Sequence, residues 1–299
     1  MIVRPHPNLI NVLLALKGSI ARRIAKRSLL VTLLAAAIVL VESLHPDYFA
    51  KVSATPFTLL GLSLSIFMSF RNNACYDRWY EARKAWGEMI TETRSIIRET
   101  QVIKDEAVRR SILRDLCGFA HGLNATLRRQ DVQQAAQPWL SRMPAPGSAS
   151  FCDTILREVG RQCSQASDSG QLNEWRYTLL ANHLSVLSRV LTTCDRIKNT
   201  PLPFPYTLLL HRTIYLFCIL LPFAMAEPLG WMTPLFIAIV SYTFFGLDAI
   251  SNELEDPFGY DENDLPTDAL VRIIERDILD ALGVSPLPPL LEPVEFVLT

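Results

Sequence analysis

Apolar residues are gathered in two parts of the chain. They concentrate near residues 29–70 and 202–247, and the stretch between these two parts is rich in charge. The run from Pro228 to Leu247 is about 20 residues long and contains no charged side chain, and at about 1.5 Å per residue it can cross a hydrocarbon core of about 30 Å. This run predicts a membrane-spanning helix.

Three further apolar runs complete a four-span pattern. Thr213 to Ala226 directly precedes the run just described, and Glu227 and Pro228 leave room only for a tight link between two antiparallel helices. Leu29 to Val41 and Val52 to Phe70 are the other two runs. The run at 29–41 is short for a bilayer, so we expect flanking residues to extend it.

The positions of basic residues give an orientation to these four spans. Lys and Arg are enriched on the cytoplasmic flanks of membrane helices. Three flanks that an even count of spans places on one side are basic, whereas the opposite side has Lys51 alone. The basic flanking residues are Arg22, Arg23, Lys26, Arg27, Arg71, Arg78, Arg83, Lys84, Arg196, Lys198 and Arg212. We therefore expect both termini and the long middle segment in the cytoplasm.

The middle segment reads as cytosolic helices. Trp86, Ile90 and Ile97 recur at helical spacing among charged residues. Breaks are predicted at 143–150 and 164–171, where proline, glycine and serine interrupt the pattern.

Prolines limit two further segments. The helix that includes residues 124–130 is expected to end no later than Gln137, because Pro138 follows. A long amphipathic helix resumes after residue 171, and the proline-rich tail after Ser285 is expected to be extended. No segment predicts a strand.

Composition excludes several classes of function. The 29 Lys and Arg nearly balance the 30 Asp and Glu, so no overall basicity points to nucleic acid. The six cysteines occur singly, which disfavours a disulfide or zinc scaffold, and they read as small buried hydrophobes. The five histidines lack metal-ligand spacing, and no glycine-rich phosphate loop is present. We expect no catalytic residue, metal or cofactor. We also expect the N-terminal segment not to be cleaved as a signal peptide, because no small-residue cleavage site follows its apolar run.

The second apolar run carries an ordered stripe. Leu62, Ile66 and Phe70 recur every four residues, while Ser63, Ser65 and Ser69 interrupt the run, so a helix would have one apolar face and one small polar face. If several subunits packed these helices around an axis, rings of the three apolar residues would form a constriction that gates by dewetting. On spacing alone the ordinary alternative is favoured, since membrane helices carry apolar residues on every face.

Three blocks of the sequence resemble the bestrophin family, particularly its bacterial members. They cover residues 56–87, 199–224 and 241–270, and the similarity extends from residue 1 to about residue 280. The resemblance implies a homopentameric channel with four membrane helices per subunit, a large cytosolic helical region and a single axial pore. The three apolar residues that line the narrow neck of the family match Leu62, Ile66 and Phe70.

The resemblance implies a second constriction at the cytosolic end. The matching position is at or next to Trp175, with Tyr177 and Thr178 as neighbouring candidates. An ordinary buried tryptophan is the alternative interpretation of Trp175.

An acidic run follows the fourth span. Carboxylates in such a run could bind calcium, and in animal bestrophins the segment after NPFG forms a calcium clasp. Here DPFG is followed by Tyr260 and Asn263 in place of carboxylates, so we doubt calcium activation. We favour helix caps and intersubunit ion pairs to the arginine-rich helices at 78–114. The residues that match the clasp are Asp256, Asp261, Glu262 and Asp264.

The sign of the conducted ion is open to two interpretations. Animal bestrophins conduct chloride, bacterial relatives are associated with cations, and apolar rings carry no sign. The acidic segment would favour cations if it faced the ion path, and would offer little selectivity if it paired with Arg78, Arg83 and Lys84. We lean towards cations.

The sequence thus predicts an all-α membrane protein with four transmembrane helices and a cytosolic helical region, assembled as a homopentameric channel. Its expected divisions are 1–70, 71–210, 211–247 and 248–299. We expect it in the bacterial inner membrane, with lipid, copies of itself and small inorganic ions as partners and no nucleic acid. The alternative is a membrane-anchored scaffolding or regulatory protein that recruits a partner and does not conduct ions. A membrane-bound enzyme would need a titratable cluster in a pocket, which the sequence does not display.

Overall fold

The computed structural model describes residues 1–3, 18–45, 53–145 and 149–299. Its described residues divide between two compact units. We call Pro5–Trp79 with Pro201–Glu255 the apolar unit, and Met1–Arg4 with Tyr80–Thr200 and Asp256–Thr299 the polar unit. The described residues are helical apart from loops and isolated β-bridges, as the sequence predicts.

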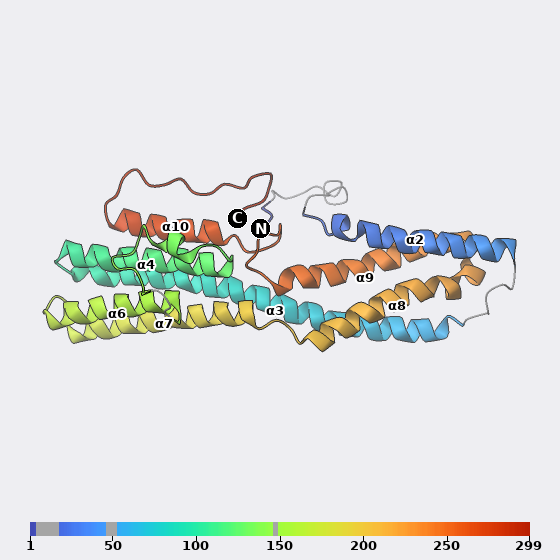
Figure 1. Cartoon of the computed structure of the whole chain (residues 1–299), viewed down its shortest axis with the longest axis horizontal. Helices are drawn as coiled ribbons and strands as arrows, with labels where there is room; N and C mark the ends of the chain where they lie inside the picture. Colours follow the sequence, from blue (N-terminus) through green and yellow to red (C-terminus); the bar gives the residue numbers. More distant parts are fainter. Residues whose placement is uncertain (4–17, 46–52, 146–148) are drawn as a thin grey trace. The chain divides into compact units, whose positions relative to one another are not determined.

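The apolar unit contains the helices that the four apolar runs predict. They are α2 (Ala21–Leu44), the first part of α3 (Thr55–Glu99), α8 (Phe204–Leu229) and α9 (Thr233–Glu255). Helix α2 packs against both α8 and α9 (Figure 1). All four helices contribute to one buried core, which includes Ile24, Val31, Leu64, Met68, Ile214, Phe217, Ile237 and Phe245. Lys51 and the start of the second run at Val52 lie outside the described residues.

The turn between α8 and α9 lies later than predicted. Glu227 and Pro228 belong to the last turn of α8, and the chain reverses at the short 3₁₀ helix η2 (Gly230–Met232). Gly230 has φ +51°, a left-handed conformation that favours glycine over residues with a side chain. The backbone freedom of glycine, and not the proline, therefore sets the reversal.

Two helical stretches are long and apolar enough to cross a bilayer by length and composition. They are Ala21–Leu44 and Phe204–Glu255, and the second comprises α8, η2 and α9. The apolar part of α3 is not among them. Four membrane spans thus stay a prediction.

The polar unit is a set of capped helices. The remainder of α3 leads into η1 (Thr100–Val102) and α4 (Glu106–Leu127), which packs against α5 (Val132–Ala136), α6 (Phe151–Asp168) and α10 (Thr267–Ala281). Helix α7 (Glu174–Asn199) packs against α6. Side chains that accept a backbone N–H hydrogen bond begin four of these helices, as N-caps do; they are Asp105, Asp131, Ser150 and Asn173.

The breaks predicted in the middle segment agree only in part with the ends of these helices. The helix that was expected to end no later than Gln137 is α4, which ends earlier, at Leu127. The separate short helix α5 ends at Ala136, before Pro138. The break expected at 164–171 begins later than predicted, because helix α6 continues to Asp168. Residues 146–148 of the other break lie outside the described residues.

The two ends of the chain pair with each other in the polar unit. The N–H of Val3 donates to the carbonyl of Phe296 at 2.8 Å, and that of Leu298 to the carbonyl of Met1 at 2.9 Å. The N–H of Ala269, in α10, donates to the carbonyl of Thr299 at 2.9 Å. The tail after Ser285 contains no helix, as predicted, but its pairing with the N-terminus had no signal in the sequence.

Candidate functional site

The apolar stripe of α3 is exposed on the protomer. Leu62, Ile66 and Phe70 are 61%, 48% and 61% exposed, respectively. These are large fractions for bulky apolar side chains, which normally bury their surface. The described part of the chain therefore leaves about half or more of the surface of the three predicted neck residues uncovered.

The opposite face of α3 is buried in the core of the apolar unit. Leu64, Met68 and Cys75 are at most 2% exposed. At Gly61 the helix approaches α8 so closely that a Cβ atom would lie 3.2 Å from the ring of Phe217. At about 100° per residue, the stripe lies about 160° around the helix from this buried face. Packing thus fixes the direction in which the stripe points.

A buried ion-pair network follows the stripe directly. Arg71 is fully buried and donates from Nη1 to Asp248 Oδ1 at 2.7 Å and from Nη2 to Asn252 Oδ1 at 2.6 Å. His211 Nδ1 lies 3.1 Å from Asp248 Oδ2, and Glu255 lies 3.6 Å from Arg71 Nη2. A buried charge is tolerated only when it is paired and hydrogen-bonded, so this network locks α3 to α9.

Sequence reasoning missed this network. It read Arg71 as a basic flank and Asp248 as part of the acidic run. The available signal was their placement, since each directly follows an apolar run and both runs were predicted to end on the same side of the bilayer. Their pairing joins residues 177 positions apart, which no local pattern reveals.

The candidate for the second constriction is also exposed. Trp175, in the first turn of α7, is 81% exposed, so it is not the buried core tryptophan of the alternative interpretation. Thr178 is exposed and Tyr177 is partly buried. Leu179, one turn after Trp175, is a further exposed apolar residue, at 43%, that the sequence analysis did not single out.

The acidic run does not converge. Asp256 pairs with Lys198 at 3.1 Å, and Asp264 accepts a hydrogen bond from the N–H of Asp261 at 2.8 Å, closing a turn that also contains Glu262. In the part of the chain that the structure describes, no group of three or more His, Cys, Asp or Glu side chains is arranged to hold a metal ion. The doubt about calcium activation thus stays a prediction from the sequence.

Several residues of the acidic run pair within the protomer with basic residues outside 78–114. Glu253 pairs with Arg23 at 2.9 Å, and Asp268 pairs with Arg128. Of the predicted partners, Arg78 donates to the backbone carbonyl of Glu255, and the Lys84 ammonium lies over the Tyr80 ring. Ion pairs within the protomer thus engage several of these carboxylates, whereas intersubunit pairs stay a prediction.

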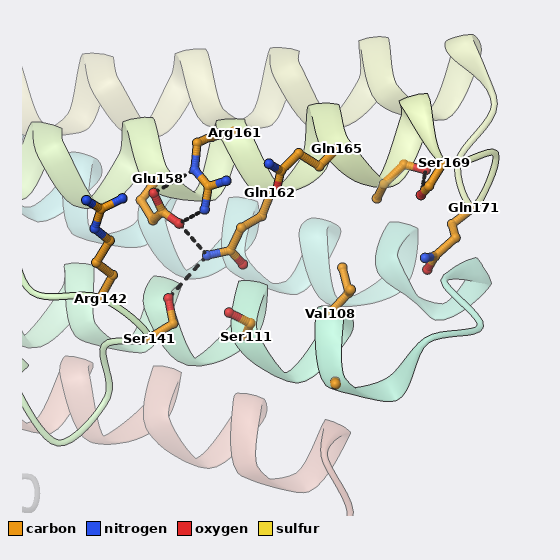
Figure 2. A pocket seen from close by; sticks show the side chains of 12 residues that line it. Val108, Ser111, Ser141, Arg142, Glu158, Arg161, Gln162, Gln165, Ser169 and Gln171 are labelled. Carbon is orange, nitrogen blue, oxygen red and sulfur yellow. Dashed lines mark hydrogen bonds and ion pairs between the residues drawn. The ribbon is translucent and has the colours of Figure 1, made fainter.

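A groove of about 600 Å³ lies in the polar unit between α4 and α6 (Figure 2). Gln162 Nε2 donates to Asp115 Oδ2 at 2.6 Å, and Ser141 donates to the same carboxylate. Burial raises the pKa of Asp115, although the hydrogen bonds from Ser141 and Gln162 act in the opposite direction. The described lining residues include no cysteine or histidine, and the Ser141 hydroxyl donates to Asp115.

Comparison with known proteins gives concordant matches. The family of bacterial and fungal bestrophin proteins matches residues 1–280. A voltage-dependent anion channel-forming protein of Mesorhizobium japonicum is 40% identical over 99% of this chain and 96% of its own length. The voltage-dependent anion channel-forming protein YneE of Salmonella typhi is 42% identical over 93% of both chains.

A solved structure agrees with the fold described above. The crystal structure of a bacterial bestrophin homologue from Klebsiella pneumoniae matches with a TM-score of 0.83 and 36% sequence identity, covering 88% of this chain and 100% of that chain. Related structures described as those of a membrane protein match equally well, with TM-scores of 0.82 and 0.83.

Proposed function

The chain belongs to the bacterial and fungal bestrophin family, which confirms the resemblance drawn from the sequence, and on that premise we propose that it is an ion channel. It is an integral membrane protein and not an enzyme. We further propose that five copies assemble around one axis and that Leu62, Ile66 and Phe70 line a hydrophobic neck on that axis.

The exposed stripe is the observation that carries this proposal. Three bulky apolar side chains point away from the core of their own protomer, in a row at four-residue spacing. A row of this kind needs cover from lipid or from other copies of the chain. Around a symmetry axis the row becomes three stacked apolar rings, which can hold a pore closed by dewetting.

The membrane arrangement follows from the same helices. We propose that α2, the first part of α3, α8 and α9 span the bilayer, with both termini and the polar unit in the cytoplasm. A bacterial inner membrane, with lipid, further copies of the chain and small inorganic ions as partners, suits this arrangement. Trp175, at the exposed start of α7, is the proposed cytosolic constriction.

The sign of the ion is a separate part of the proposal. The relatives from Mesorhizobium japonicum and Salmonella typhi are named as anion channel-forming proteins. Our preference for cations first rested on the acidic run after α9, yet Asp256 and Asp268 pair with Lys198 and Arg128 in the same chain. These two carboxylates are therefore weaker candidates for the source of a cation preference.

Ion flux through reconstituted protein tests the neck. In liposomes, the substitutions Leu62→Ala, Ile66→Ala and Phe70→Ala should each raise the flux of small monovalent ions at least about twofold, because smaller side chains widen the apolar rings and allow them to wet. Phe67→Ala is the matched control. Phe67 is 52% exposed on the same helix but lies about 100° around it from Ile66.

Two results would contradict the proposal. One is the absence of flux from well-folded pentamers of the wild type and of all three neck variants. The other is an equal increase in flux with Phe67→Ala, which would mean that truncation loosens the helix in general. Silent neck substitutions combined with loss of function from surface changes between residues 86 and 130 would favour the alternative, a membrane-anchored scaffold.

A further inference from the structure

Asp77 lies on the same face of α3 as the neck stripe. It follows Phe70 by seven residues, which is almost two helical turns, and so lies about 20° around the helix from Phe70 and about 10 Å further along the axis. Asn73 falls between them on the same face. Both residues are exposed, whereas Arg71 and Cys75 on the opposite face are buried.

The Asp77 carboxylate has no cation to neutralise it among the described residues. The residues three and four positions away on the helix are Asn73, Ala74, Tyr80 and Glu81, and none is basic. No hydrogen bond or ion pair in the described part of the chain engages the Asp77 side chain.

Other carboxylates near the end of α9 differ from Asp77 in this respect. Asp248 is held by Arg71 and His211, and Glu253 pairs with Arg23. Asp77 therefore places a negative charge on the face of the stripe that no described residue of the apolar unit neutralises.

From the proposed assembly, on which this inference rests, we propose that Asp77 determines the sign of the conducted ion. One copy from each subunit would form a ring of carboxylates directly beyond the apolar neck. Rings of Asp or Glu attract cations and repel anions from a pore, and a low-dielectric surround strengthens that field. Asp77 thus selects small monovalent cations, while the neck residues control whether the path is open.

The charge of Asp77 can be removed without changing its shape. We compare the wild type with Asp77→Asn and Asp77→Glu in planar bilayers under asymmetric KCl, where the reversal potential gives the permeability ratio of cation to anion. We expect a cation-selective wild type, a ratio at least about threefold lower in Asp77→Asn, and wild-type selectivity in Asp77→Glu. The reduction should be larger in dilute salt, where screening is weaker.

Asp153→Asn is the matched control. It removes the same charge from each subunit, from the partly exposed side chain of Asp153 on α6 in the polar unit, which pairs with Arg157, and should leave the reversal potential unchanged. An equal shift in this control would assign the effect to total charge and overturn the proposal.

Failure of this inference can be told apart from failure of the channel. If Phe70→Ala raises conductance but Asp77→Asn leaves the reversal potential unchanged, or if the wild type prefers chloride, the channel stands and the role of Asp77 is wrong. If neither the wild type nor Phe70→Ala conducts, both proposals are wrong.

Discussion

The two parts of α3 are one continuous helix with opposite relations to their surroundings. From Thr55 to Trp79, the part in the apolar unit, a narrow face is buried, and apolar side chains on the rest of the surface are exposed. From Tyr80 to Glu99, the part in the polar unit, Trp86 and Met89 are fully buried, and the acidic side chains along the helix are engaged by partners.

Helix α7 supplies those partners in an ordered series. Four acidic residues of α3 pair in reverse order with four basic residues of α7, as two antiparallel helices require. The pairs are Glu81 with Arg196, Glu88 with Arg189, Glu92 with His183 and Glu99 with Arg176.

The difference shows where a function can be located on this helix. In the polar unit the protomer buries Trp86 and Met89 and pairs the four glutamates of α3. In the apolar unit it buries the charge of Arg71, whereas Leu62, Ile66, Phe70 and Asp77 are exposed in the described part of that unit. The surface left for ions, lipid or other copies is therefore the one before Tyr80.

The largest loss of stability is expected from Arg71→Met, because Arg71 is a fully buried charge in the part of α3 that belongs to the apolar unit. The substitution leaves Asp248 buried with only His211 beside it, and removing one partner of a buried ion pair costs about 3–5 kcal/mol. We expect a large loss of folded protein, measured as the thermal midpoint and the size-exclusion profile in detergent.

Two further variants make the Arg71 test specific. Arg22→Met, at an exposed position of α2, should be nearly silent. The double variant Arg71→Met with Asp248→Leu should recover part of the loss, because it leaves no unpaired charge in the core. A double variant that is less stable than Arg71→Met alone would contradict this account.

Truncating one aromatic side chain in each part of α3 compares how much each part contributes to the stability of the protein. Trp86 is fully buried in the polar unit, so Trp86→Ala should reduce stability by about 3–5 kcal/mol. Phe70 is 61% exposed, so Phe70→Ala should lower the thermal midpoint much less and instead change ion flux. Equal losses of stability would show that Phe70 is packed and not a free neck residue.

The sequence predicts the helices of the apolar unit well, because each must contain a long uncharged run. It places a division at residue 70, inside α3, because composition changes abruptly there from apolar to charged. Helix propensity does not change at that point, and the ion pairs that stabilise the charged part are with α7, more than 75 residues away. Periodicity alone could not reveal these partners.

The candidate site was predictable in part for a similar reason. Spacing identified Leu62, Ile66 and Phe70 as a row, and the resemblance gave the row a role. Its direction depends on which face of α3 is buried, and the contacts of Leu64, Met68 and Arg71 with distant helices determine that face. Once that face is known, the angle of about 100° per residue places Asp77 on the same face as the row. The spacing of apolar residues alone does not identify Asp77.

The smallest effect is expected from the ion pairs between α3 and α7. Arg189 and Arg196 are 65% and 59% exposed at their side chains, so solvent and salt screen their interactions with Glu88 and Glu81. Arg189→Gln or Arg196→Gln should lower the thermal midpoint by no more than about 4 °C, and this difference from the wild type should disappear at about 1 M salt. Arg157→Gln, which removes an exposed pair within α6, is the control for general loss of surface charge. Two results would contradict this expectation: a loss of stability as large as that of Trp86→Ala, or an effect that high salt leaves unchanged. Either result would mean that these pairs stabilise the fold as strongly as the Arg71 network. The two parts of α3 would then not differ in the way described above.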